Sequence, residues 1–86
     1  TDLGREIRER LEAAVQAGLS PESEEGKEIT ALHRRWLTIT GNRYNPARHR
    51  GIAELYVTDE RFTGYYDKQV PGCACFLRDT VIHWVK

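Results

Sequence analysis

The chain has 86 residues, with 13 basic and 13 acidic side chains, 40% hydrophobic and 9% aromatic residues. This is the composition of one small globular domain, and it excludes a disordered segment. No apolar run approaches the roughly 18 residues that a membrane-spanning helix needs, and no secretory signal opens the chain, so we expect a cytoplasmic protein with no membrane contact.

The first two predicted elements are helices with recognisable ends. An amphipathic helix is predicted over residues 2–17, and Gly18 ends it because glycine readily takes the left-handed conformation found after helices. Ser20 is predicted to cap the second helix, with Pro21 at its first position. This helix should end near Thr38, where β-branched residues begin.

A loop and two further helices follow. The loop is predicted over residues 39–45, and Asn45 caps a third helix that begins at Pro46. Thr58 or Asp59 caps a short fourth helix.

The fourth helix should end near Gln69, and Val70-Pro71 should start the last one. No segment alternates apolar and polar residues. The sequence therefore predicts an all-α fold of about five short helices, forming a single domain over residues 1–86.

The arginines are concentrated in the middle of the chain. Residues 29–53 carry five arginines and no acidic residue, although the whole chain is formally neutral. Two interpretations are open: a solvated face, or a basic surface over residues 34–50 that binds a protein or nucleic-acid partner.

Two histidines lie sixteen positions apart, each on the apolar side of its predicted helix. His33 and His49 have no orienting carboxylate at a recognisable spacing, so a catalytic or metal-binding pair is disfavoured. The remaining alternatives are two partly buried histidines bonded to neighbouring backbone, or ligand contacts.

The two cysteines, Cys73 and Cys75, are one residue apart and are expected to be reduced. Cys73 lies on the core side of the last helix and Cys75 about 200° around it, so they cannot bind one metal ion. Both are interpreted as small hydrophobic residues, with a reactive Cys73 thiol near the helix N-terminus as the alternative.

One stretch resembles a known family. Residues 51–63 read Gly-Ile-Ala-Glu-Leu-Tyr-Val-Thr-Asp-Glu-Arg-Phe-Thr, and residues 71–79 read Pro-Gly-Cys-Ala-Cys-Phe-Leu-Arg-Asp. Together with His33-Arg34-Arg35-Trp36 upstream, they resemble the TipAS-like antibiotic-recognition domain of the thiostrepton-induced regulators. The resemblance covers roughly residues 5–84.

The resemblance implies a helical, globin-like ligand-binding domain that is not an enzyme and needs no cofactor or metal. Such domains usually follow a MerR-type DNA-binding domain and bind bulky peptide-like antibiotics such as thiopeptides. DNA would then be contacted only through an upstream domain. The family also has further helices upstream, so we expect this chain to lack part of the full domain.

Some family members capture their ligand through a cysteine in the loop between the two histidine helices. Here that place holds Tyr44 or Pro46, so we expect non-covalent binding. Tyr44 stands in a loop beside a basic residue, which leaves open whether it is recognition surface or core.

The family's cleft falls on seven residues of this chain. The expected stacking surfaces are Trp36, Tyr44, Tyr56 and Phe62, and the expected polar anchors are His33, Asn45 and His49. The resemblance thus favours a drug-recognition domain, either of a MerR-family regulator or of a stand-alone resistance protein. The alternative is an interaction domain that uses the basic surface over residues 34–50 to bind a protein or nucleic-acid partner.

Overall fold

In the computed structural model, which describes residues 2–39, 41 and 43–85, five α-helices are joined by short connections. They are α1 (Asp2–Gln16), α2 (Glu24–Thr38), α3 (Pro46–Thr58), α4 (Glu60–Asp67) and α5 (Cys73–Trp84). No β-strand occurs among the described residues. The all-α prediction is therefore confirmed.

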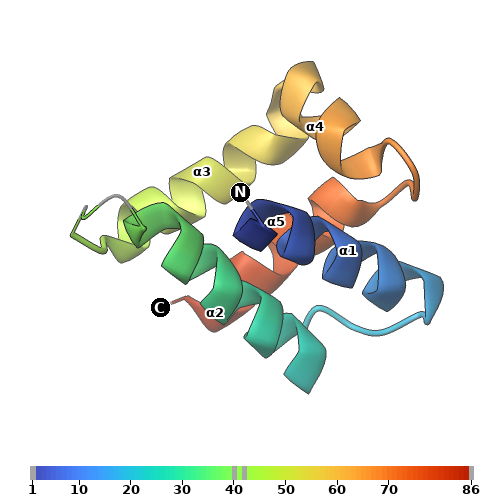
Figure 1. The fold of residues 1–86 in the computed structure, drawn as a ribbon, viewed down its shortest axis with the longest axis horizontal. Helices are drawn as coiled ribbons and strands as arrows, with labels where there is room; N and C mark the ends of the chain where they lie inside the picture. The colour runs from blue at the N-terminus through green and yellow to red at the C-terminus, as the bar shows by residue number, and fades with distance from the viewer. Residues whose placement is uncertain (1, 40, 42, 86) are drawn as a thin grey trace.

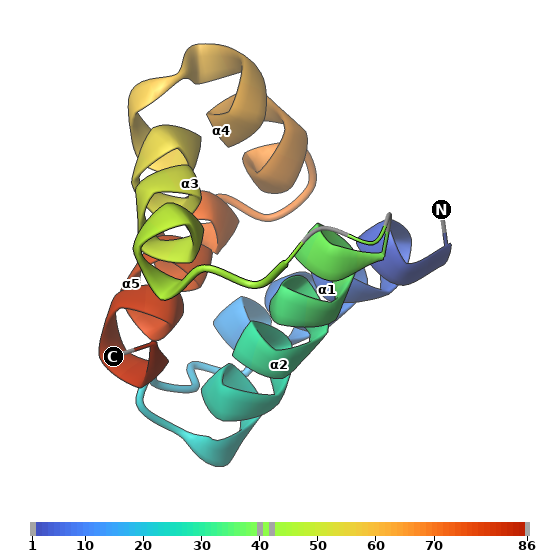
Figure 2. The same cartoon turned by 90° about the vertical axis from the view of Figure 1, so that its left-hand side faces the viewer.

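Helix α5 is the central element, since it packs against each of the other four helices. Helices α1 and α2 lie side by side, and α3 and α4 follow one another on the opposite side of α5 (Figures 1 and 2). The core is apolar and draws on every helix, with α5 contributing the most buried residues. Its fully buried large side chains include Ile7, Leu11, Ile29, Leu77 and Val81.

Several predicted helix ends are confirmed. Helix α1 ends one residue before the predicted position, and Gly18 has the expected positive φ of 72°. The side chain of Asn45 accepts a hydrogen bond from the backbone N–H of Arg48, which caps α3. Asp59 caps α4 in the same way. None of the described helices is long and apolar enough to cross a membrane.

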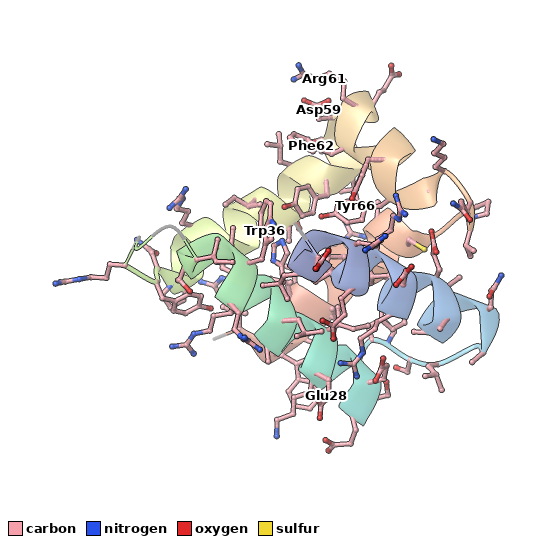
Figure 3. The ribbon with its side chains drawn as sticks, viewed as in Figure 1. Glu28, Trp36, Asp59, Arg61, Phe62 and Tyr66 are labelled. Carbon is pink, nitrogen blue, oxygen red and sulfur yellow. The ribbon has the colours of Figure 1, made fainter. Side chains whose placement is uncertain are left out.

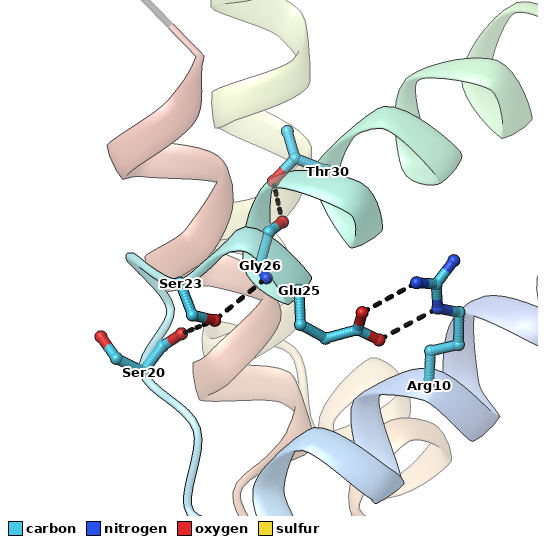
Figure 4. A network of polar contacts seen from close by, with 6 residues as sticks. All are labelled: Arg10, Ser20, Ser23, Glu25, Gly26 and Thr30. Carbon is cyan, nitrogen blue, oxygen red and sulfur yellow. Dashed lines mark hydrogen bonds and ion pairs between the residues drawn. The ribbon is translucent and has the colours of Figure 1, made fainter.

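The start of α2 was predicted wrongly. The helix begins at Glu24 and not at Pro21, and Ser23 is its N-cap, accepting a hydrogen bond from Gly26 N–H at 3.3 Å (Figure 4). The Ser23 backbone N–H bonds Ser20 in a preceding turn. The N-cap was therefore predicted three residues too early, at Ser20 and not at Ser23.

The physical reason lies in the carbonyl of Pro21. That oxygen accepts hydrogen bonds from the Thr80 hydroxyl and from the Trp84 indole N–H of α5, each at 2.9 Å. A helix starting at Pro21 would need the same oxygen for an intrahelical bond to Glu25. The two contacts with α5 therefore hold this segment as a turn.

The start of α5 also differs from the prediction. The helix begins at Cys73 after Gly72, which has a φ of 100° and offers no side-chain cap. The missing cap is replaced by Asp67 at the end of α4, whose carboxylate accepts the Ala74 backbone N–H at 2.8 Å. The Val70-Pro71 signal marked the connection rather than the helix itself.

A partly buried ion pair joins α1 to α2. Arg10 donates two hydrogen bonds to the carboxylate of Glu25, at 3.0 and 2.8 Å (Figure 4). Such a two-point pair fixes the relative position of its helices more strictly than a single contact would. It holds α1 against the first turn of α2.

Candidate functional site

A cavity of about 430 Å³ lies where α1, α2, α3 and α4 approach one another. Its wall is mainly aromatic. The lining residues are Gly4 and Ile7 of α1, Trp36 of α2, Tyr56 of α3, and Arg61, Phe62, Tyr65 and Tyr66 of α4. We call this the aromatic pocket. Trp36, Phe62 and Tyr66 lie close together in Figure 3, far from Glu28 at the other end of α2.

The rings of the aromatic pocket pack in contact with one another. The Tyr56 ring lies 5.4 Å from Phe62 and 5.0 Å from Tyr66, centroid to centroid, in tilted geometry. Tyr65 meets Tyr66 edge-on at 5.0 Å. Tyr56 and Tyr66 are buried, whereas Trp36, Phe62 and Tyr65 are 37%, 37% and 45% exposed. The pocket thus has a buried floor and an open aromatic rim.

Arg61 is the one charged residue of the pocket lining. Its side chain is held by Asp59, the N-cap of α4, through guanidinium–carboxylate hydrogen bonds of 3.2 and 2.8 Å. The hydrogen bonds from Arg61 lower the pKa of the Asp59 carboxyl, so the pair stays charged at neutral pH. Both residues lie at the tip of the α3–α4 corner (Figure 3), and the cation therefore stands at the pocket's rim.

A chain of hydrogen-bonded rings runs through the core from this pocket. The Tyr56 hydroxyl lies 3.1 Å from Nε2 of His33, and Nδ1 of His33 lies 2.8 Å from Nε2 of His49. Nδ1 of His49 in turn lies 2.9 Å from the Tyr44 hydroxyl. We call Tyr44–His49–His33–Tyr56 the ring chain. All four of its members are among the seven sequence-predicted residues, and Tyr56 also lines the aromatic pocket.

The two histidines of the ring chain are fully buried and neutral. Burial, together with the neighbouring ring, lowers the pKa of His33 from 6.5 to about 3. Burial and the positive charge of Arg34 lower the pKa of His49 to about 4. The expectation of partly buried histidines bonded to neighbouring backbone was therefore wrong, because each ring bonds other side chains at both nitrogens.

The structure places the seven predicted residues in four settings. Trp36, Tyr56 and Phe62 line the aromatic pocket, and His33 and His49 lie behind it, with the Trp36 ring stacked on His33 at 5.7 Å. Tyr44 is half-buried, with the Arg34 guanidinium 4.1 Å above its ring, and lines a second cavity of about 420 Å³ between α2 and α5. Asn45 is exposed and occupied as the α3 cap.

Sequence reasoning missed Tyr65, Tyr66 and Arg61 as pocket residues. Phe62, Tyr65 and Tyr66 sit at helical spacing on α4, an element of eight residues with a single buried side chain. So short a helix does not need three aromatic residues for its own packing. This excess was the signal in the sequence that could have identified the pocket wall.

Both cysteines lie outside the pocket. Cys73 is fully buried, and burial with the nearby Asp67 carboxylate raises the pKa of its thiol to about 11. The alternative of a reactive thiol at Cys73 is therefore wrong. Cys75 is exposed on the far side of α5 from the core. Among the described residues, no group of histidine, cysteine and acidic side chains could hold a metal ion.

The arginines of the middle segment do not share one setting. Arg34 covers Tyr44, whereas Arg50 lies in a groove of about 860 Å³ between α3 and α5 that also contains acidic residues. Those acidic residues are Glu22, Glu54 and Asp79. The mixed charge of this groove favours the interpretation as a solvated surface.

An all-helical domain that places aromatic residues from three helices around an open pocket has the geometry typical of a ligand-binding domain. Comparison with known families identifies it further: the TipAS antibiotic-recognition domain matches residues 1–84. The chain belongs to this family, which consists of ligand-binding domains and not of enzymes.

Named relatives agree with this assignment. The chain is 34% identical over 83 residues to the HTH-type transcriptional activator TipA of Streptomyces coelicolor and to TipA of Streptomyces lividans. The match covers 94% of this chain but 32% of each relative, so the chain spans about a third of their length. It is also 48% identical over 33 residues to the HTH-type transcriptional activator mta of Bacillus subtilis, covering 38% of this chain and 13% of that protein. No solved structure matches the chain.

Proposed function

We propose that the chain binds a bulky, peptide-like or macrocyclic antibiotic non-covalently in the aromatic pocket. The observation that carries the proposal is the pocket itself: five aromatic side chains from three helices around about 430 Å³, in a TipAS domain. Ligand sites typically have volumes of about 300–1,000 Å³ and apolar walls with few polar groups. Multi-ring ligands stack favourably on such walls.

The exposed rim supports a ligand larger than the cavity. Trp36, Phe62 and Tyr65 each leave more than a third of their surface open to solvent. A macrocycle can therefore place one ring between these side chains while the rest covers the rim. Arg61 adds a cation that can interact with ligand carbonyl groups or ring faces. Neither cysteine faces this cavity, which supports non-covalent binding.

The names of the relatives support a proposal for the setting of this binding. TipA and mta are named as transcriptional activators, and this chain corresponds to a minor part of each. We therefore propose that drug binding here is the input of a cytoplasmic regulator of the MerR type, with DNA contacted by another domain. Helices upstream of this segment, expected from the family, would complete the cleft in the longer protein.

The test is a titration with thiostrepton, followed by amide NMR and tryptophan fluorescence. We expect saturable shifts at Trp36, Tyr56 and Phe62. Phe62→Ala and Trp36→Ala should each weaken binding about tenfold or more, as for buried aromatic contacts at an interface. Leu55→Ala is the matched control, because Leu55 is 44% exposed but lies outside the pocket.

Two results would overturn the proposal. One is saturable binding that Phe62→Ala and Trp36→Ala leave unchanged. The other is the absence of any saturable change at high micromolar concentration across thiopeptides and related multi-ring antibiotics. Binding of nucleic acid or protein that weakens with salt and is lost on changing Arg43, Arg48 and Arg50 would instead establish the partner-binding alternative.

A further inference from the structure

The hydrogens of the ring chain can be counted, and this count limits the directions that its hydrogen bonds can take. A neutral histidine carries one ring N–H and one unprotonated nitrogen, and a tyrosine hydroxyl carries one hydrogen. The three contacts of the chain, 2.9, 2.8 and 3.1 Å long, each need one hydrogen. The low pKa values of His33 and His49 keep both rings neutral at pH 7.

Only two arrangements satisfy all three contacts. In the first, Tyr44 donates to Nδ1 of His49, Nε2–H of His49 donates to His33, and Nε2–H of His33 donates to the Tyr56 oxygen. In the second, every hydrogen bond is reversed, and both histidines carry their hydrogen on Nδ1. The two histidines must therefore change tautomer together, since a mixed pair would oppose two N–H groups or two lone pairs.

The two arrangements differ at the ends of the chain. In the first, the Tyr56 hydroxyl keeps its hydrogen free for another partner; in the second, it offers only a lone pair. Tyr56 lines the aromatic pocket beside Tyr66, whose ring centroid lies 5.0 Å from its own. The direction of the hydrogen bonds in the ring chain thus decides whether the Tyr56 hydroxyl, at the floor of the pocket, offers a hydrogen or only a lone pair.

We propose that the ring chain reverses its hydrogen-bond direction to match the ligand, so that Tyr56 accepts from ligand donors and donates to ligand acceptors. This inference rests on the proposed function for its biological meaning. It makes His33 and His49 specificity-determining positioning residues that never touch the ligand. A pocket of this kind accepts chemically different drugs without moving its aromatic wall.

Reversal also changes the far end of the chain. The Tyr44 hydroxyl donates inward to His49 in the first arrangement and is free to donate outward in the second. Tyr44 is half-buried in the second cavity, under Arg34. The direction of the ring chain therefore also decides whether the Tyr44 hydroxyl has a free hydrogen in the second cavity, between α2 and α5, on the other side of the two histidines.

The experiment needs no ligand, so its failure and the failure of antibiotic binding are distinguishable. The ¹⁵N resonances of the histidine rings show which nitrogen carries the hydrogen. Tyr44→Phe should place both hydrogens on Nε2, and Tyr56→Phe should place both on Nδ1, because a buried N–H without a partner is the costlier defect. Tyr65→Phe, in the pocket but outside the ring chain, should match the wild type.

Opposite tautomers in Tyr44→Phe and Tyr56→Phe establish the reversal, and identical tautomers in both overturn it. If Tyr56→Phe does not fold, the wild type decides: ring shifts between the two limits that change with temperature support reversal, whereas shifts fixed at one limit exclude it. Adding thiostrepton should then move the averaged wild-type shifts of both rings toward the same limit.

Discussion

The hydroxyl of Thr80 in α5 donates a hydrogen bond of 2.9 Å to the carbonyl oxygen of Pro21, in the turn before α2. The same hydroxyl lies 3.3 Å from that of Thr30, which donates to the carbonyl of Gly26. This buried polar cluster fastens the first turn of α2 directly onto α5. The approach is close enough to require a glycine at position 26.

Gly26→Ala should therefore destabilise the fold. A Cβ atom at Gly26 would lie 2.6 Å from the Thr80 hydroxyl oxygen and would clash with the carbonyl of Pro21. Because backbone cannot yield as a flexible side chain can, we expect a loss of about 2 kcal/mol or more in the free energy of unfolding. Urea denaturation measures this loss.

Gly51→Ala is the matched control for this change. Gly51 lies in the interior of α3, and a Cβ atom there meets no atom within 4 Å. Alanine should raise stability by up to about 1 kcal/mol through its better helix propensity. Equal effects of the two alanines would contradict the close approach at Gly26.

The buried histidines predict a loss of stability in mild acid. His33 and His49 have pKa values lowered to about 3 and about 4 in the folded protein, whereas an unfolded histidine has a pKa near 6.5. Below pH 6.5 the unfolded chain binds protons that the folded chain cannot, so stability falls as the pH falls toward 4. Each histidine contributes a slope of about 1.4 kcal/mol per pH unit in this window.

Two measurements check this prediction. Urea midpoints between pH 7 and pH 4.5 should decrease steadily. The ring resonances of His33 and His49 should not titrate in the folded protein between pH 8 and pH 5. A titration of either ring near pH 6.5 would show that it is not buried in neutral form.

The two cysteines should differ sharply in reactivity. Cys75 is exposed, whereas Cys73 is fully buried with a thiol pKa raised to about 11. Ellman's reagent should modify one thiol in the native protein and two in denaturant, and Cys75→Ser should abolish the native reaction. A fast native reaction in Cys75→Ser would place the Cys73 thiol at the surface.

Asp67, at the end of α4, should act as the N-terminal cap of α5. Its carboxylate accepts the Ala74 N–H, since Gly72 has no side chain to do so. Asp67→Ala should cost about 1 kcal/mol in unfolding free energy, within the range for lost N-caps. Asp67→Asn, which keeps an accepting oxygen, should restore most of this loss, and Asp79→Ala on the exposed side of α5 serves as the control.

Local sequence signals predicted the helix ends correctly where the capping hydrogen bonds form between residues close together in the sequence. Asn45 and Asp59 cap the helices that follow them, as expected from their side chains. The prediction failed at Pro21, where hydrogen bonds from α5 residues 59 and 63 positions away decide the local conformation. No local pattern contains that information.

The same distinction holds for the site. Trp36, Tyr56 and Phe62 were placed in the cleft by a family resemblance, and all three line the aromatic pocket. The contact between His33 and His49 could not be predicted, because their spacing of sixteen residues fits no single helix face. It depends on how α2 and α3 are placed relative to one another, which only the tertiary fold defines.

Half of the residues that line the pocket come from α4, the described helix with the fewest buried side chains. Helix α4 has eight residues and one buried side chain, yet it supplies Arg61, Phe62, Tyr65 and Tyr66 to the lining. Its amide hydrogens should exchange with solvent far faster than those of α5, and bound antibiotic should slow them most. Part of the intrinsic binding energy is then consumed in ordering this wall, so variants that stiffen α4 without touching the ligand should bind it more tightly.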